Sequence, residues 1–83
     1  MEQNKNHKVV RVKRCDSKLQ FVKAIKTVTN KSLLESKNIA DSLIDCHGRS
    51  NGVILLNESS ITPSEWEEIA ATSLNYGLEW EYV

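Results

Sequence analysis

The side chains that could do chemistry include two cysteines and two histidines. Cys15 and Cys46 are the only cysteines, and with His7 and His47 they could in principle form a zinc set. However, the chain has no Cys-x-x-Cys or His-x-x-x-His spacing, and the adjacent Cys46 and His47 do not readily chelate one ion. We therefore expect no metal and no cofactor, and we interpret the cysteines as reduced thiols.

Three glutamates, Glu65, Glu67 and Glu68, could suggest acid–base catalysis. They follow Thr62 and Pro63, where a helix is expected to begin, and the helix dipole stabilises carboxylates near a helix N-terminus. The sequence contains no nucleophile motif, phosphate-binding loop or metal signature. Because the features required for a catalytic site are missing, we expect a protein that is not an enzyme.

The basic side chains are confined to one part of the chain. Residues 1–49 hold all 11 Lys and Arg together with 5 acidic side chains, whereas residues 50–83 hold 6 acidic and no basic ones. The formal net charge of zero therefore conceals a dipolar protein. A one-sided charge distribution of this kind is typical of a recognition surface.

A nucleic-acid interface is one interpretation of the basic half. The side chains that could contact phosphates are Lys8, Arg11, Lys13, Arg14, Lys18, Lys23 and Lys26. The only aromatic residue among them is Phe21, which helical spacing places in the core, and the chain as a whole is neutral. Arg11 and Lys13 can instead pair across strands with Glu79 and Glu81. We therefore do not favour nucleic acid as the partner.

The elements that position these residues begin with a strand and a helix. Residues 7–14 (HKVVRVKR) alternate, with Val10 and Val12 on one face. Asp16 or Ser17 can cap a helix over residues 18–29. The inward stripe of this helix is Phe21, Ala24, Ile25 and Val28. The side chains expected on its outward side are Leu19, Val22, Lys23 and Lys26.

A second helix is expected over residues 33–45. Asn30 can end the first helix in a left-handed conformation, and Ser32 with Glu35 forms a capping box that opens the second. Its predicted inward stripe is Leu33, Ser36, Ile39, Ala40, Leu43 and Ile44. Leu34 and Lys37 point away from that stripe, so a hydrophobic side chain again lies beside a lysine.

A third helix is expected over residues 63–76. Thr62 and Glu65 form a second capping box, with Pro63 at the first helical position. The side chains that we expect this helix to bury are Trp66, Ile69, Ala70, Ser73 and Leu74. Gly77 occupies the position where a glycine commonly ends a helix.

The remaining elements complete a small α+β domain. The turn HGRSNG, residues 47–52, precedes an apolar strand over residues 53–57, and residues 78–83 alternate as a last strand. The expected fold is a two-layer sandwich in the order β-α-α-β-α-β, a three-stranded antiparallel sheet covered by three helices. We expect residues 1–6 to be a flexible N-terminus and residues 7–83 to form a single domain.

The stretch from Lys18 to Asp41 resembles the C-terminal domain of the bacterial ribosomal large-subunit stalk protein. That family runs Lys–aliphatic–x–aliphatic–aliphatic–Lys–x–aliphatic–Arg, followed by Thr-Gly-Leu-Gly-Leu and Lys-Glu-Ala-Lys. The matching positions here are Lys18, Leu19, Phe21, Val22, Lys23, Ile25, Lys26, Thr29, Leu33, Glu35 and Lys37, without a gap. Residues 61–65 and 76–80 also match the family's entry to its last helix and last strand, so the resemblance covers most of residues 18–83. The family's two glycines are replaced by Asn30 and Ser32, and one of its lysines by Leu34.

This resemblance implies a non-catalytic protein-binding domain that docks translational GTPases on its first two helices. It implies contact positions at Leu19, Val22, Lys23, Lys26 and Lys37. Helical spacing adds Leu34 as a further outward aliphatic residue. A domain of this kind could act as a standalone modulator of translation, either as an accessory protein or as one encoded by a phage.

The stretch from Ser42 to Leu56 is longer than in the stalk family and is similar to a relative with the same fold. That relative is the Clp protease adaptor, which delivers N-degron substrates to a Clp ATPase. Its pocket needs an Asn-Asp-Asp-type stretch after the first strand and a histidine on the second helix. The nearest candidates here are Cys15-Asp16 and His47. Adaptor function is therefore the alternative interpretation.

The sequence also gives an expectation for the compartment. No apolar run approaches the ~20 residues that a membrane-spanning helix needs. The first residues, MEQNKNHK, lack the apolar stretch of an export signal. We therefore expect a cytoplasmic protein without a membrane partner.

Overall fold

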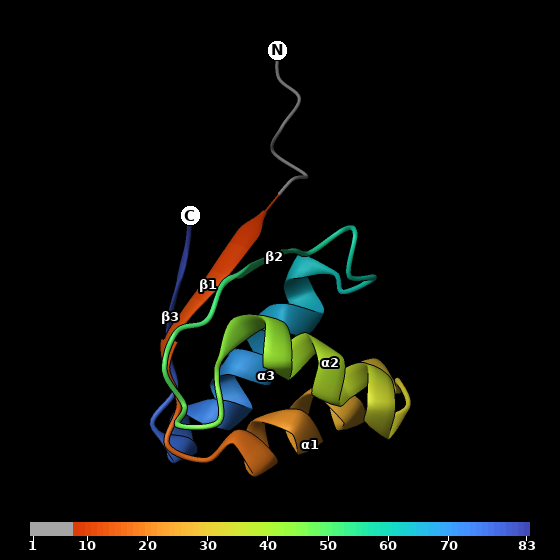
Figure 1. Ribbon diagram of the computed structural model, residues 1–83. Coiled ribbons are helices and arrows are strands. Elements are labelled where there is room, and N and C mark those ends of the chain that lie inside the picture. Colours follow the sequence, from red (N-terminus) through yellow and green to blue (C-terminus); the bar gives the residue numbers. More distant parts are fainter. Residues whose placement is uncertain (1–7) are drawn as a thin grey trace.

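A three-stranded antiparallel sheet forms one layer of the molecule, and helices pack on one of its faces (Figure 1). The computed structural model describes residues 8–83. The predicted flexible N-terminus, residues 1–6, and His7, the predicted start of the first strand, lie outside the described residues. The element order β-α-α-β-α-β confirms the predicted α+β fold. Across the described part of the chain, none of the helices has the length and apolar character needed to cross a membrane.

The central strand of the sheet is β1 (Val9–Arg14). It pairs antiparallel with β2 (Val53–Leu55) on one side and with β3 (Glu79–Tyr82) on the other. Val10 and Val12 are fully buried, as their alternation predicts. Their burial shows that this face of β1 lies against the helices.

Strand β2 is shorter than the predicted strand over residues 53–57. The carbonyl oxygen of Leu55 accepts the N–H groups of Glu58 and Ser59, at 3.1 and 3.0 Å. These bonds close a turn directly after Leu55, so the chain leaves the sheet before Asn57. The turn leads to Ile61, which is buried.

Helix α1 (Lys18–Thr29) has the predicted bounds. Of the two candidate caps, Ser17 is the one used, because its hydroxyl accepts the N–H of Gln20 at 3.4 Å. Asn30 ends the helix in the left-handed conformation, with φ 59°. Asparagine tolerates this conformation better than most residues, so the prediction for Asn30 is confirmed.

Helix α2 (Leu33–Leu43) begins with the predicted capping box between Ser32 and Glu35. It ends two residues before the predicted boundary, because Ile44 is extended and bridges to Ser50. The prediction that Leu33 faces inward is wrong, since its side chain is 59% exposed. The first turn of α2 borders an open groove there rather than the core.

Helix α3 (Pro63–Ser73) also begins with its predicted capping box and continues into a 3₁₀ turn, η2 (Leu74–Tyr76). The predicted burial of Leu74 is wrong, because this side chain is exposed. Leu74 lies at the edge of the stripe formed by Trp66, Ile69, Ala70 and Ser73, where α3 gives way to the 3₁₀ turn. Gly77 ends the turn with φ 76°, as predicted.

Aromatic side chains join the two layers. Trp66 of α3 is fully buried and packs edge-to-face against Phe21 of α1 and Trp80 of β3, at centroid distances of 6.1 and 5.5 Å. Trp80 in turn packs against Tyr82 at 4.8 Å. Edge-to-face pairs add to the stabilisation from burial, so Trp66 ties both α1 and α3 to the sheet.

The sheet face away from the helices carries cross-strand ion pairs. Glu81 lies 3.2 Å from Arg11 and 3.7 Å from Lys13, which confirms the predicted pairing of these two cations. Glu79 pairs with Arg14 at 3.5 Å instead, because a bulge in β1 shifts the register at that point. Arg11, Lys13 and Arg14 of β1 thus each have a carboxylate partner.

Candidate protein-binding surface

An open groove of about 490 Å³ lies between α1 and α2. The residues that line it are Lys18, Leu19 and Val22 of α1, Leu33 and Lys37 of α2, and Cys46 from the loop after α2. Leu19 is 62% exposed, whereas Val22 is only 6% exposed and forms part of the floor. The groove thus has apolar walls with two lysines among them.

Local geometry explains why these side chains meet. Leu19 and Val22 are three residues apart on α1, and Leu33 and Lys37 are four apart on α2, so each pair lies on one side of its helix. The two helices pack against each other along their buried sides. The groove is therefore a direct product of helical spacing combined with α1–α2 packing.

The turn that carries Cys46 is held by Asp45. Its carboxylate accepts the backbone N–H groups of His47 and Arg49, at 2.8 and 3.0 Å. These hydrogen bonds, that of Arg49 first, lower the pKa of Asp45 below its ordinary value. Gly48 adopts a φ of +76°, and an added Cβ there would overlap the carbonyl oxygen of Cys15. The position of the exposed Cys46 thiol beside the groove is thus fixed by the fold.

Asp41 connects the two lysines of the groove. Its carboxylate contacts Lys18 Nζ at 2.5 Å through one oxygen and Lys37 Nζ at 3.4 Å through the other. The hydrogen bond from Lys18 is the main cause that lowers the pKa of Asp41, and Lys37 contributes less. Two cations therefore share one anion, which leaves this cluster with a net positive charge.

The structure brings half of the predicted contact residues to the groove. Leu19, Val22 and Lys37 line it. However, the prediction that Val22 points outward is wrong, because Val22 belongs to the hydrophobic core. Since α1 packs against both α2 and α3, its buried arc is wider than the single stripe that periodicity predicts. Val22 can contribute to a binding surface only as the floor of the groove.

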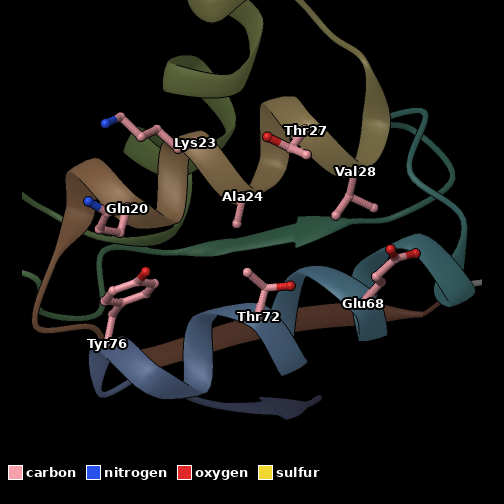
Figure 2. Close-up of a pocket in the computed structure, with 8 residues that line it drawn as sticks. All are labelled: Gln20, Lys23, Ala24, Thr27, Val28, Glu68, Thr72 and Tyr76. Atoms are coloured by element: carbon pink, nitrogen blue, oxygen red, sulfur yellow. The ribbon is translucent and has the colours of Figure 1, made fainter.

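The other three predicted contact residues lie outside the groove. Lys23 borders a second hollow of about 260 Å³ between α1 and α3 (Figure 2). In Figure 2 its side chain extends away from α3 and from Glu68. Lys26 and Leu34 are exposed and line neither hollow. The predicted set is therefore spread over the surface of both helices.

The hollow between α1 and α3 is less apolar than the α1–α2 groove. Its floor includes Ala24 and Val28 of α1, while Thr72 and Glu68 come from α3 (Figure 2). Tyr76 of η2 lines the same hollow. Most of the side chains that line it carry a hydroxyl, amide or charged group, so this hollow is a weaker candidate for apolar contact than the groove.

Sequence reasoning missed Lys18, Leu33 and Cys46 as residues of the groove. The signal for Lys18 was available from helical spacing, because Lys18 lies four residues before Val22 on α1. Leu33 was assigned to the core from its spacing, and Cys46 reaches the groove only through the turn after α2. A contact of that kind depends on tertiary structure.

The residues that would support the Clp-adaptor alternative do not line the groove. Asp16 is bound by Arg14 Nη2 at 2.7 Å, and His47 is exposed on its turn. Cys15 is buried, and burial raises the pKa of its thiol. Within residues 8–83, no three His, Cys, Asp or Glu side chains are grouped so that they could hold a metal ion.

The surface of α1 and α2 thus combines an apolar groove with basic side chains around it. Comparisons of this chain with known protein families, with curated proteins and with solved structures find no match. The interpretation of this surface therefore rests on its own geometry and charge.

Proposed function

We propose that this chain is a non-catalytic protein-binding domain that docks its partner on the surface of α1 and α2. The observation that carries this proposal is the α1–α2 groove, where Leu19 and Leu33 are both more than half exposed beside the buried Val22. Exposed aliphatic side chains around a hollow are typical of an interaction site. Leu34, also exposed, extends the apolar surface on the first turn of α2.

Lysines on the same two helices supply the basic part of the surface. In residues 8–83, Lys23 and Lys26 have no carboxylate oxygen within 4.0 Å, unlike the cations of β1. Their charge is therefore available to a partner. An apolar centre with charged residues around it is the usual arrangement of a protein interface.

A translational GTPase is the first candidate partner. This choice rests on the resemblance of α1 and α2 to the stalk domain, which docks such GTPases on the corresponding helices. A free domain with this surface would compete with the ribosomal stalk and so modulate translation. The contact area of one helix pair is small, so we expect modest affinity that falls as salt rises.

The test measures binding of the immobilised chain to a purified bacterial elongation-factor GTPase by biolayer interferometry. We expect the double variant Lys23→Glu/Lys26→Glu to bind about tenfold more weakly, as reversal of two exposed charges warrants. The matched control is Lys13→Glu/Arg49→Glu, which makes the same change in charge away from α1 and α2. Binding by the control should stay within about twofold of wild type.

Three results would overturn this proposal. Failure of the wild-type chain to bind the GTPase removes the candidate partner. Equal weakening of both double variants means that net charge alone matters. Unchanged binding by Lys23→Glu/Lys26→Glu means that the lysines of α1 lie outside the contact surface.

The groove favours stalk-like docking over Clp-adaptor function. The N-terminal residue of an N-degron carries an ammonium group, and the candidate carboxylate to receive it, that of Asp16, is already paired with Arg14 at 2.7 Å. Adaptor function predicts that the chain binds a purified Clp ATPase and that Lys23→Glu/Lys26→Glu leaves this binding intact. That result, together with no binding to the GTPase, would replace our proposal with the adaptor.

A further inference from the structure

The two lysines of the α1–α2 groove are arranged like a receptor for an anion. Lys18 and Lys37 come from different helices and direct their ammonium groups to the same carboxylate, that of Asp41. An ammonium group carries three donors, so a single bond to Asp41 leaves further donors on each lysine. The same two lysines line the groove beside Leu19, Val22 and Leu33.

We propose that the groove binds an aliphatic side chain that lies next to a carboxylate, and that Lys18 and Lys37 receive this carboxylate. The ligand is then an acidic segment of a partner protein in which a leucine or isoleucine is followed by a negative charge. This inference rests on the proposed function and deepens it, because it names the chemistry that the partner presents to the groove.

Charge complementarity favours this ligand over others. Two cations and one anion leave a net charge of +1 beside the apolar walls. A basic segment or a free N-terminus would be repelled, whereas a purely apolar segment would gain nothing from the lysines. A carboxylate adjacent to an aliphatic side chain satisfies both parts of the groove at once.

The cluster is already organised in the free protein. The side chain of Lys18 is only 25% exposed, against 63% for Lys37, so the stem of Lys18 lies against the protein while its ammonium reaches Asp41. A side chain that is already ordered loses less entropy when it binds a ligand. Asp41 thus acts as a positioning residue, because it holds both ammonium groups at the groove.

Asp41 also competes with the ligand. Its carboxylate occupies donors that an incoming carboxylate would use, and its negative charge opposes a second one nearby. At these exposed positions we expect the competition to outweigh the loss of order when Asp41 is neutralised. The free protein therefore binds acidic segments more weakly than the two lysines alone would allow.

The test uses two small probes and the full chain labelled with nitrogen-15. N-acetyl-L-leucine carries an aliphatic side chain next to a carboxylate, and N-acetyl-L-leucinamide is its neutral counterpart. We expect both to shift amide signals of residues that line the groove in NMR titrations. The acid should bind about threefold more tightly at low salt, a preference that shrinks as salt rises.

Three variants separate the roles of the charged residues. Lys18→Gln/Lys37→Gln should abolish the preference for the acid, because it removes both ammonium groups that receive the carboxylate. Asp41→Asn should raise the preference by about twofold, because the internal competitor is gone. The matched control, Lys13→Gln, removes an exposed lysine of the sheet that does not line the groove and should leave the preference as in wild type.

Equal affinity for acid and amide in the wild-type chain would overturn the inference, as would signal shifts confined to residues outside the groove. A lower preference in Asp41→Asn would overturn the competing role of Asp41. These failures are distinguishable from failure of the proposed function. GTPase binding that depends on Lys23 and Lys26 could persist without any preference for the acid, and the preference could exist without GTPase binding.

Discussion

The outer face of the sheet and the surface of α1 and α2 both carry side chains from the basic half of the chain, but these side chains differ in whether the fold gives them a carboxylate partner. On the sheet, Arg11 and Lys13 share Glu81 from the neighbouring strand. On α1, Lys23 and Lys26 have no carboxylate partner within the described residues. A basic stretch of sequence therefore becomes a basic surface only where the fold brings no acid to it.

The difference has a local cause on each side. Antiparallel pairing puts the acidic last strand directly beside β1, so that charges of opposite sign face each other. On a helix, the available partners are three or four residues away. For Lys23 these neighbours are Leu19, Gln20, Lys26 and Thr27, none of which is acidic. The helical charge is thus left for another molecule.

The largest expected effect is on stability and arises at Val22, which belongs both to the groove and to the hydrophobic core. Val22→Ala removes two buried carbon atoms and should lower the free energy of unfolding by about 2 kcal/mol. Leu19→Ala, on the same side of α1 but largely exposed, should change it by less than about 0.5 kcal/mol. Urea denaturation followed by circular dichroism measures both.

Both substitutions should weaken binding of the GTPase, because both remove apolar atoms from the groove. A stable Val22→Ala variant with unchanged binding would show that the floor of the groove is only core. An equal loss of stability in the two variants would contradict the difference in burial on which the groove is built.

A smaller effect on stability is expected when the ion pairs of Glu81 with Arg11 and Lys13 are disrupted. Glu81→Lys replaces the shared partner of Arg11 and Lys13 with a third cation. We expect the free energy of unfolding to fall by about 1 kcal/mol at low salt, because exposed pairs contribute little and like charges on neighbouring strands repel. The loss should shrink in about 0.5 M salt, because salt screens charges at exposed positions.

The matched control is Glu58→Lys, which makes the same change of charge at an exposed residue without an ion pair in the described part of the chain. GTPase binding by Glu81→Lys should remain close to wild type, since the sheet lies outside the proposed surface. If binding fell as it does for Lys23→Glu/Lys26→Glu, the two surfaces would not differ in function.

The sequence predicts the elements of this fold well because their signals are local. Ser32 with Glu35, and Thr62 with Glu65, are capping boxes that satisfy backbone groups within four residues, and both form as predicted. Asn30 and Gly77 end their elements in the left-handed conformation for equally local reasons. Alternation and helical spacing then place most of the core.

The groove was less predictable because it depends on what packs beside each helix. Periodicity assigned Val22 to the outside and Leu33 to the inside, and both assignments are wrong. A period of 3.6 residues shows which side chains share a face, but it does not give the width of the buried arc or the point where a neighbouring helix ends. The link from Asp41 to Lys18 crosses between helices and has no signature in sequence spacing.

The smallest expected effect is the part of the stability loss at low pH that depends on Asp41. This carboxylate pairs with Lys18 and Lys37 of the α1–α2 surface. The hydrogen bond from Lys18, supported by Lys37, holds the pKa of Asp41 below its ordinary value of 3.8. A carboxylate with a lowered pKa in the folded state binds fewer protons there than when unfolded. Its contribution to stability is therefore present above pH 3.8 and is lost as pH falls through the lowered value.

Asp41→Asn cannot titrate, so this variant should lose less stability than wild type when urea denaturation at pH 7 is compared with denaturation at about pH 3. Asp45 supplies the matched control, because backbone N–H groups rather than lysines lower its pKa. Lys37→Gln should reduce the loss of stability in acid that comes from Asp41. The loss that comes from Asp45 should stay unchanged. If wild type and Asp41→Asn lost equal stability, the Lys18–Asp41–Lys37 cluster would not persist in solution. Lys18 would then lack a carboxylate partner in solution, as Lys23 does among residues 8–83.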